Sequence, residues 1–441
     1  MTRADEASVP SEPSEPITLL AVGDLHLGRH PTRVAVDEPA LRVAEVWGAC
    51  VDEAIRRRVD AVVLVGDIVD RANRFYEALG PLLGGISRLS EAGVEVFAVA
   101  GNHDFDVLER AAASAPALRV LGVGGRWEAA ALERRGQRVR LLGWSFCTEH
   151  VHTSAFETFD AAMWGADGAR CVGVVHGELG AAASAYNPTT RADLEASPCG
   201  LWLLGHLHAP QHVRLPSGKQ ALYPGTPQPL HPGEGGVHGP WLVRMGDVVE
   251  VSQLPLATVA YREVTVALDG ISARAEADAA LVAALQRALE ALQEDQPGLR
   301  AASLRVRLVG ETPLHSQLAA LAKGAQEELD LSTPERLVTL DRVEVRTRPP
   351  VQLDELARVD DPPGLIARML LELDAPELNK KPSAQLDALR RHLTLTANHA
   401  VFTALDDAGR WPDTPQADAM IRQQLYTLLD ALLAPRIEGA P

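Results

Sequence analysis

The sequence predicts an α/β fold in which parallel strands alternate with helices and polar side chains gather where strands end. Three segments share one pattern: an apolar, β-branched run is followed at once by a turn that carries glycine with an acid, an amide or a histidine. They are ITLLAVGDLHLG (17–28), DAVVLVGDIVDR (60–71) and VEVFAVAGNHD (94–104). Such a pattern is typical of a buried strand that delivers polar groups at its carboxyl end.

The segments between these strands have helical periodicity. Residues 40–59 (ALRVAEVWGACVDEAIRRRV) and 77–93 (EALGPLLGGISRLSEAG) place apolar residues at helical spacing and end at a strand or a glycine. Strand, helix and strand in succession indicate βαβ units and a parallel sheet. Because ligand sites in such sheets gather at the carboxyl edge, we expect the three turns to meet there.

Length and charge limit the class of protein. A chain of 441 residues exceeds one ordinary core, so we expect a large domain with smaller companions. Residues 1–16 are rich in Pro, Glu and Ser and lack an apolar stretch, so we expect a disordered lead and a cytoplasmic protein with no membrane contact. The net charge of -17 argues against a chain that coats nucleic acid with its own surface.

Five predicted strand ends carry side chains of the types that bind divalent metal ions. Taken singly, each such residue is as typical of a turn cap or of core packing. Together they offer carboxylate, imidazole and amide donors without a thiolate, which favours a hard or borderline divalent ion. The donors exceed what one tetrahedral ion needs, so we expect two ions, bridged by one carboxylate at the ~3.5–4 Å separation of two-metal hydrolases. The candidates are Asp24, His26, Asp67, Asp70, Asn102, His103, His176, His206 and His208.

The ordered blocks GDLH, GDIVDR, GNHD, VVHG and GHLH, between residues 23 and 208, resemble the signature of the calcineurin-like metallophosphoesterases. The resemblance implies a four-layer αββα sandwich and two divalent ions, with manganese as the first expectation and iron, zinc or magnesium as alternatives. It assigns Asp24, His26, Asp67 and His208 to the first ion, and Asp67, Asn102, His176 and His206 to the second. Gly205 is expected to let the backbone turn tightly before His206.

The remaining polar residues of these turns receive roles from the chemistry. Two cations polarise a phosphodiester, and in-line attack leaves an alkoxide that needs a proton. His103 is the expected general acid, and Asp70 is expected to orient it and keep it protonated. Arg71 is assigned to a substrate phosphate oxygen or, equally, to an ordinary surface ion pair. Asp104 is expected to cap the helix that FDVLERAAA predicts.

Further segments resemble the DNA-repair exonuclease branch of this superfamily, which holds the SbcD-like and YhaO-like proteins. They are GHLHAPQ (205–211), YPGTPQPLHPGEGGVHGPWLV (223–243), HGELG (176–180) and SAYNP (184–188). The resemblance implies a two-metal DNA exonuclease or endonuclease that serves as the nuclease subunit of an SMC-like, SbcC-like ATPase complex in DNA repair. The implied partners are DNA, that ATPase and a second copy of the chain, since such nucleases are commonly dimers.

Two other functions stay open from the residues alone. One is a metallophosphodiesterase or phosphatase acting on a small-molecule phosphoester, because one scaffold hosts many substrates. The other is a scaffold subunit with a vestigial metal site. The acidic charge is compatible with a nuclease subunit if the ATPase supplies DNA-binding surface, so we expect the isolated chain to bind DNA weakly and in a salt-sensitive way.

We expect a catalytic domain over 17–256, a small α+β cap domain over 257–350 and a helical region over 351–441. The cap is predicted from strand patterns at 260–268, 303–310 and 335–347 and helix patterns at 273–293 and near 313–329. The last helix, ADAMIRQQLYTLLDALL, is expected to pack on the cap or to dock on a partner coiled coil. Its predicted apolar stripe comprises Met420, Ile421, Leu425, Leu428, Leu429 and Leu432.

Overall fold

The computed structural model describes residues 15–34, 38–70, 77–160, 170–181, 184–375, 384–397 and 414–433. It divides into two compact units. Unit 1 comprises the described residues up to Arg262 with Leu289–Ser303 and Leu331–Thr339, and unit 2 comprises Glu263–Ala288, Leu304–Asp330 and the described residues from Leu340 on. The cut at Arg262 falls inside a strand, so the domain limits expected from the sequence stay predictions. All but two residues of the expected lead over 1–16, and Arg71, lie outside the described residues.

The first sheet of unit 1 has six strands in the order β14-β13-β1-β2-β3-β4. Its strands are β1 (Ile17–Val22), β2 (Ala61–Val65), β3 (Glu95–Val99), β4 (Leu118–Val120), β13 (Trp241–Met245) and β14 (Val249–Gln253). Strands β1 to β4 run parallel, and β13 and β14 add an antiparallel edge. The parallel run with intervening helices confirms the predicted βαβ units, and it brings the turns after β1, β2 and β3 to one edge.

The second sheet also has six strands, in the order β11-β12-β10-β7-β6-β5. They are β5 (Glu128–Arg134), β6 (Gln137–Trp144), β7 (Arg170–His176), β10 (Leu201–Gly205), β11 (Gln211–Arg214) and β12 (Gln220–Tyr223). Strands β7 and β10 are parallel neighbours whose ends coincide, because Gly205 pairs with His176. Two short strands, β8 (Glu178–Leu179) and β9 (Pro188–Thr189), pair separately.

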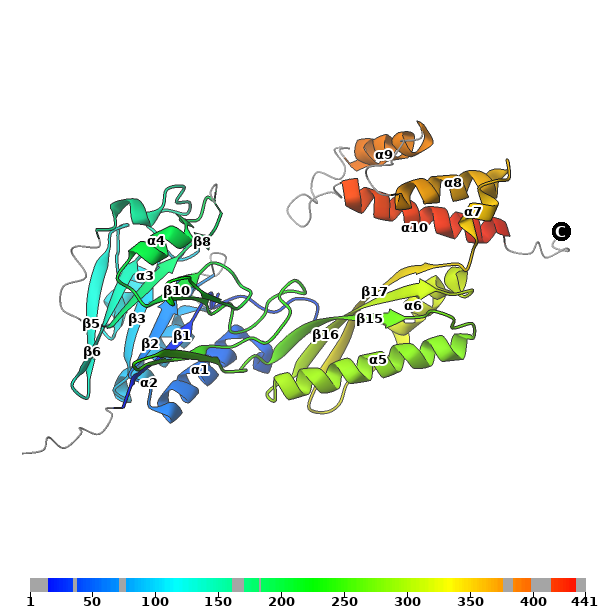
Figure 1. Ribbon diagram of the computed structural model, residues 1–441. Helices are drawn as coiled ribbons and strands as arrows, with labels where there is room; N and C mark the ends of the chain where they lie inside the picture. Colours follow the sequence, from blue (N-terminus) through cyan, green and yellow to red (C-terminus); the bar gives the residue numbers. More distant parts are fainter. Residues whose placement is uncertain are drawn as a thin grey trace, which may run out of the picture. The chain divides into compact units, whose positions relative to one another are not determined.

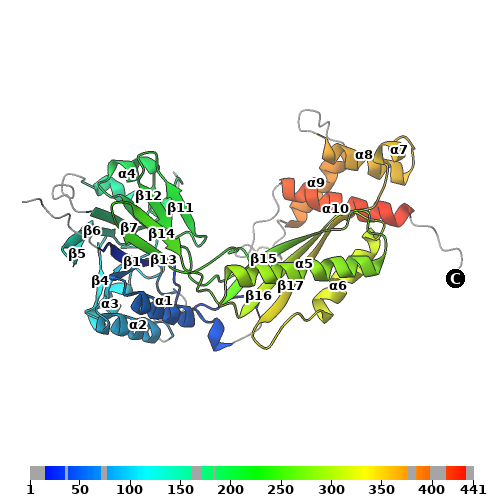
Figure 2. The ribbon, with the colours of Figure 1, turned by 60° about the horizontal axis from the view of Figure 1, so that its bottom comes forward.

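The two sheets pack face to face, and helices cover their outer faces (Figures 1 and 2). Helices α1 (Val43–Arg57), α2 (Leu79–Glu91) and α3 (Leu108–Ser114) lie on the outer face of the first sheet, and α4 (Arg191–Ala196) lies on that of the second. Short 3-10 helices occur at Pro39–Leu41 and Ala155–Thr158. The core between the sheets includes Leu19, Val63, Phe97, Leu141, Val174 and Leu203. These layers confirm the predicted αββα sandwich, in which the fourth layer is thin because α4 has only 6 residues.

The rest of the chain forms a three-stranded sheet and a helical group (Figure 1). The sheet has the order β15-β16-β17, with β15 (Val259–Ala267), β16 (Ala301–Glu311) and β17 (Leu337–Arg348). The helices are α5 (Arg274–Asp295), α6 (Leu318–Glu328), α7 (Leu353–Leu356), α8 (Pro362–Asp374), α9 (Ala384–Ala397) and α10 (Thr414–Leu433), with a 3-10 turn at His315–Gln317. These strands and helices occur where the sequence patterns place them.

Only half of the apolar stripe predicted on the last helix is buried. Ile421, Leu425 and Leu429 are buried in a small core with residues of α8 and α9. The other three predicted members stay in solvent, with exposed fractions of 47% for Met420, 50% for Leu428 and 45% for Leu432. One part of the stripe therefore packs inside unit 2, and the other part is exposed.

One buried carboxylate at the far end of the parallel strands carries a stability prediction. Asp60 accepts hydrogen bonds from the Thr18 N–H (2.8 Å) and from Arg135 Nη1 and Nη2 (2.8 and 2.6 Å). Burial raises the pKa of Asp60, but these hydrogen bonds outweigh it and hold the pKa below the usual value. A carboxyl group with a lowered pKa stabilises the fold above its unfolded pKa of about 3.9 and stops doing so as the pH falls through the folded value.

We therefore expect Asp60→Asn to lower the free energy of unfolding by about 1–2 kcal/mol near neutral pH. The difference from the native chain should shrink as the pH falls below about 3.9 to pH ~3, because the contribution of Asp60 is lost as the pH approaches its lowered folded pKa. Urea unfolding at the two pH values measures it. The control is Asp52→Asn. Asp52 is exposed on α1 and pairs with Arg88, so this substitution should not measurably change the free energy of unfolding. An equal loss at both pH values would contradict the account.

Candidate metal centre

The candidate centre lies where five strands end, three from the first sheet and two from the second. The turns after β1, β2 and β3, the last residue of β7 and the turn after β10 carry all the predicted donors. The two sheets thus share the site, because their parallel strands present their carboxyl ends at the same edge of the sandwich. The structure brings together Asp24, His26, Asp67, Asp70, Asn102, His103, His176, His206 and His208.

The first group of donors is Asp24, His26 and His208, whose ligand atoms lie within 4.8 Å of one another. His26 Nε2 and His208 Nε2 are 3.0 Å apart. Two imidazole nitrogens that share one cation at about 2.0–2.1 Å would be spaced in this way. Oδ2 of Asp24 is buried and has no hydrogen-bond partner among the described residues. The group therefore fits a divalent ion, which would satisfy all three side chains at once.

The second group surrounds His176. Its Nε2 lies 3.1 Å from Asn102 Oδ1 and 3.5 Å from Asp67 Oδ2. The ring of His206 is 5.5 Å from that of His176, centroid to centroid. The same Asp67 oxygen is 3.9 Å from His26 Nε2 in the first group. Asp67 therefore lies between the two groups, as a bridging carboxylate requires, and the assignment of four donors to each ion stays a prediction.

Four of these residues have an unusual backbone conformation. Asp24, His26, Asp67 and His206 have φ angles of 38°, 47°, 48° and 96°. The left-handed region is costly for residues with a side chain, and such strain concentrates at functional sites. The His26 N–H donates to the Asp67 carbonyl (2.8 Å), which ties two of the strained turns together.

The role expected for Gly205 is wrong. The chain leaves the regular strand at His206, and Gly205 is the last residue of β10. A Cβ on Gly205 would lie 1.9 Å from the Val65 carbonyl oxygen and 2.5 Å from His176 Nδ1. Glycine is needed here because β10 approaches β2 and His176 closely, which is what draws the donors of the two sheets together.

Burial dominates the electrostatics of the donors. It raises the pKa of Asp24 to about 6, and it lowers the pKa of His26 and that of His206, the latter to about 4. Burial also raises the pKa of Asp67, but the surrounding histidines, His176 foremost, outweigh it and hold this pKa below the usual value. Neutral imidazole is the form that binds metal, so His26 and His206 need not lose a proton at neutral pH to act as ligands.

His103 lies beside both groups, and its side chain is 30% exposed. Its Nε2 is 4.0 Å from Asp67 Oδ2 and its Nδ1 is 3.9 Å from Asp70 Oδ2. Burial lowers the pKa of His103 and outweighs the opposite effect of the two carboxylates, Asp67 and Asp70. That Asp70 orients His103 and keeps it protonated stays a prediction. Asp70 also lies 3.8 Å from His26 Nδ1 and 3.6 Å from Arg29 Nε.

The helix cap expected at Asp104 is also wrong. Helix α3 begins at Leu108, and no side chain caps it. Asp104 is fully buried, and its carboxylate accepts hydrogen bonds from the N–H groups of Gly101 (2.8 Å) and Ile68 (2.6 Å). Burial raises the pKa of Asp104 to about 7. Its structural role is to tie the turn after β3 to the turn after β2.

Sequence reasoning missed Glu234, which supports one of the donors. Its Oε1 accepts a hydrogen bond from His208 Nδ1 (2.5 Å), and its Oε2 accepts one from the Leu230 N–H (2.6 Å). A carboxylate on the second nitrogen of a ligating histidine fixes the tautomer and the ring orientation. Glu234 lies 26 positions beyond His208 in a loop with no regular pattern, so no local signal pointed to it.

Asn187 and an aromatic rim were also missed. Asn187 donates from Nδ2 to the His176 carbonyl (2.9 Å) and supports the end of β7. The aromatic rim comprises Tyr186, His150 and His152: the Tyr186 ring is 4.5 Å from that of His206, the His150 ring 5.7 Å from Tyr186, and the His152 ring 6.2 Å from His150. The rim extends from the predicted metal ligand His206 to the exposed side chains of His150 and His152.

We expect Glu234→Gln to weaken manganese binding by about tenfold to a hundredfold with little change in thermal stability, because His208 loses its charged partner. Isothermal titration of the metal-free protein with Mn²⁺ measures it. The matched control is His231→Gln, since His231 contacts the same carboxylate (3.1 Å) from the exposed side. Unchanged manganese affinity in Glu234→Gln would show that Glu234 does not support the centre.

Two parts of the chain match families of known proteins. Residues 17–210 match the calcineurin-like phosphoesterase family, and residues 261–348 match the middle domain of the metallophosphoesterase YhaO. The chain thus contains a calcineurin-like metallophosphoesterase domain followed by a YhaO-like middle domain. Calcineurin-like phosphoesterases use a dinuclear metal centre, and the donor groups described above are candidates for it.

Particular relatives are more distant. The chain is 28% identical over 260 residues to the uncharacterized metallophosphoesterase YhaO of Bacillus subtilis, covering 53% of this chain and 59% of that protein. It is 26% identical over 233 residues to the DNA double-strand break repair protein Mre11 of Methanopyrus kandleri, covering 47% of this chain and 48% of that protein. The chain therefore matches only about half the length of these relatives.

A dimetal phosphatase from Danio rerio has a TM-score of 0.38 at 14% identity, covering 55% of this chain and 97% of that one, a likeness too weak to support an argument. Within the described residues, no helix is both long and apolar enough to cross a membrane.

Proposed function

We propose that the chain is a two-metal phosphodiesterase that cleaves DNA as an exonuclease or endonuclease. The observation that carries the proposal is the arrangement of His103 and Asp67. The imidazole stands 4.0 Å from the carboxylate that lies between the two donor groups, and it reaches solvent. A proton donor is thereby placed beside the position at which the ions would hold a phosphate.

The residues of the site have different roles in the proposed reaction. The donors would hold the ions, which would supply electrophilic stabilisation of the phosphate and a more acidic water. His103 supplies a proton from its ring to the leaving oxygen. Asp104 and Glu234 keep the turns and His208 in place without contacting substrate. Arg29, paired with Asp70, adds a positive charge at the same edge.

Two observations support nucleic acid as the substrate. One is the similarity to Mre11, a DNA double-strand break repair protein. The other is the aromatic rim, because rings beside a phosphate site offer stacking faces for bases. The net charge of -17 favours the second candidate, a small phosphoester, for a chain acting alone. The third candidate, a scaffold with a vestigial site, is disfavoured because the predicted donors all come together at one edge of the sandwich.

The proposal includes partners. An SMC-like ATPase subunit would supply the positive DNA-binding surface that the acidic chain lacks, and the exposed side chains of α10, Met420, Leu428 and Leu432, offer an apolar face for docking. A homodimer is proposed as well, since two copies would place two centres near one DNA. Manganese is proposed as the native metal because the donors combine oxygen and imidazole ligands.

The test is hydrolysis by the manganese-loaded chain of linear duplex DNA, single-stranded DNA and a chromogenic phosphodiester, at low and physiological salt. We expect turnover of the small diester, and DNA cleavage that declines steeply with salt. Turnover of only the small diester, not extended to DNA by an added SMC-like ATPase, would favour the small-molecule enzyme. Turnover of none of the three substrates would favour the scaffold subunit with a vestigial metal site.

A further inference from the structure

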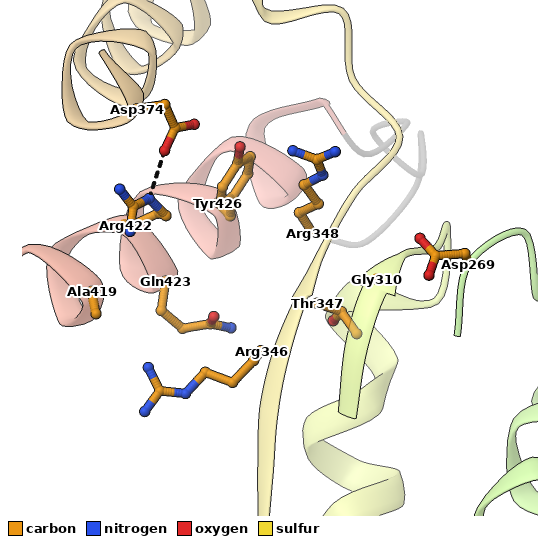
Figure 3. Close-up of a pocket in the computed structure, with 10 residues that line it drawn as sticks. All are labelled: Asp269, Gly310, Arg346, Thr347, Arg348, Asp374, Ala419, Arg422, Gln423 and Tyr426. Carbon is orange, nitrogen blue, oxygen red and sulfur yellow. Dashed lines mark hydrogen bonds and ion pairs between the residues drawn. The ribbon is translucent and has the colours of Figure 1, made fainter. Parts of the chain in front are cut away.

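A polar cavity of about 380 Å³ lies in unit 2, between the end of β17 and helix α10. Figure 3 shows Arg346 and Arg348 of β17 on one side, and Arg422, Gln423 and Tyr426 of α10 on the other. Three guanidinium groups, an amide and a phenol therefore line one space. This is a donor-rich lining, unlike the mostly apolar lining of sites for uncharged small molecules.

The two arginines of β17 keep donors available. Arg346 gives Nε and Nη2 to Glu344 (3.3 and 3.2 Å), and Arg348 Nε lies 3.3 Å from Glu311 Oε2. A guanidinium has five N–H groups in a rigid fork, so each pair occupies only part of it. Because the two side chains are 41% and 56% exposed, their ion pairs contribute little and can be shared with an incoming anion.

The opposite wall is held in place by contacts of its own. Arg422 donates from Nε to Asp374 Oδ1 (2.9 Å) and from Nη2 to the Leu373 carbonyl (3.1 Å), which fixes the guanidinium between α8 and α10. The other acidic group of the lining, Asp269, accepts the Glu311 N–H through Oδ1 (2.9 Å). Asp374 is thus paired with Arg422, and the three arginines of the lining outnumber its two carboxylates.

We propose that this cavity binds a phosphate group with at most one nucleoside attached to it inside the cavity. Each planar guanidinium fork can donate to two phosphate oxygens at once. A phosphate has more oxygens than a single carboxylate, so it can engage more of these forks together. The volume suits a small molecule, and most of the residues that line the cavity have polar side chains. The phosphate could belong to a free nucleotide or to the end of a nucleic-acid strand, which present the same chemistry. The site is separate from the candidate metal centre, since all its residues belong to unit 2.

The test is isothermal titration of the metal-free chain, in the presence of EDTA, with inorganic phosphate, AMP and a short single-stranded oligonucleotide. We expect AMP to bind, and the double variant Arg346→Gln/Arg348→Gln to weaken this binding by at least about tenfold. Arg422 is left intact because it joins two helices. The matched control is Arg342→Gln, which removes an exposed arginine on the same strand, paired with the same Glu344 (3.1 Å), and should leave the affinity within about twofold.

Each outcome decides the proposal or its ligand. Binding of AMP or phosphate that depends on the two arginines supports a free phosphate ligand, and arginine-dependent binding of the oligonucleotide alone supports a strand end. Absence of binding to all three probes, or equal affinity in the double variant, would overturn the proposal. Hydrolysis of the chromogenic diester by the manganese-loaded double variant should equal that of the native chain, so failure here is distinguishable from failure of the proposed function.

Discussion

His103→Ala is expected to hydrolyse a phosphodiester about 10²–10⁴-fold more slowly than the native chain while binding the same number of manganese ions. The imidazole lies 4.0 Å from Asp67 Oδ2 but contributes no atom to the two donor groups assigned from the sequence. Removing it deletes a proton donor and leaves the ligands in place. Steady-state rates on a phosphodiester with an alkoxide leaving group, with metal content measured on the same samples, test the two parts together.

Two comparisons make this result specific. His30→Ala removes an exposed histidine that pairs with Glu77 and should retain the native rate within about twofold. A leaving group that needs no proton, such as a nitrophenolate, should lose less rate than an alkyl ester when His103 is removed. Loss of an ion in His103→Ala would make His103 a ligand, as its closeness to His26 and Asp67 also allows. A full rate with both substrates would exclude it as the acid.

Asp67→Asn is expected to reduce hydrolysis below about a thousandth of the native rate and to weaken binding of both ions, because one carboxylate serves both donor groups. Its Oδ2 lies 3.9 Å from His26 Nε2 and 3.5 Å from His176 Nε2. Its Oδ1 accepts the His103 N–H (2.8 Å), a hydrogen bond that the asparagine oxygen can still accept. The turn should therefore persist while the bridging charge is lost. Metal content and the rate on the chromogenic diester are measured on the same preparation.

Asp52→Asn, on the exposed face of α1, is the control for the loss of one negative charge, and it should bind both ions as the native chain does. Circular dichroism and thermal unfolding check that Asp67→Asn is folded. If Asp67→Asn retains two tightly bound ions, Asp67 is not the bridge. If it retains one, the carboxylate serves a single ion and the assignment of the groups must change.

The parts of the site that the sequence predicted are those with a local pattern. Asp24, Asp67 and Asn102 each follow an apolar run within a few residues, and the geometry of a parallel sheet then brings the turns to one edge. His206 and His208 follow β10 in the same way. Strand ends are predictable because the strand and its polar turn lie in one continuous segment of the sequence.

The parts that were missed depend on contacts between distant segments. Glu234 reaches His208 from a loop without periodicity, and Asp104 binds the N–H of Ile68 on another turn instead of capping its own helix. Position 205 requires glycine because Val65 approaches it closely. This contact with a distant segment is not predictable from residues 201–208 alone. The burial of only half of the α10 stripe was not predictable, because periodicity shows which residues share a face and does not show how much of that face a neighbour covers.

The most direct test of the central claim is to add Mn²⁺ stepwise to the metal-free protein while measuring bound ions and hydrolysis of the chromogenic diester together. The two donor groups that share Asp67 predict two ions per chain and activity that appears only as the second is bound. Full activity with one ion bound, or binding that stops at one, would contradict a two-metal centre at this edge of the sandwich.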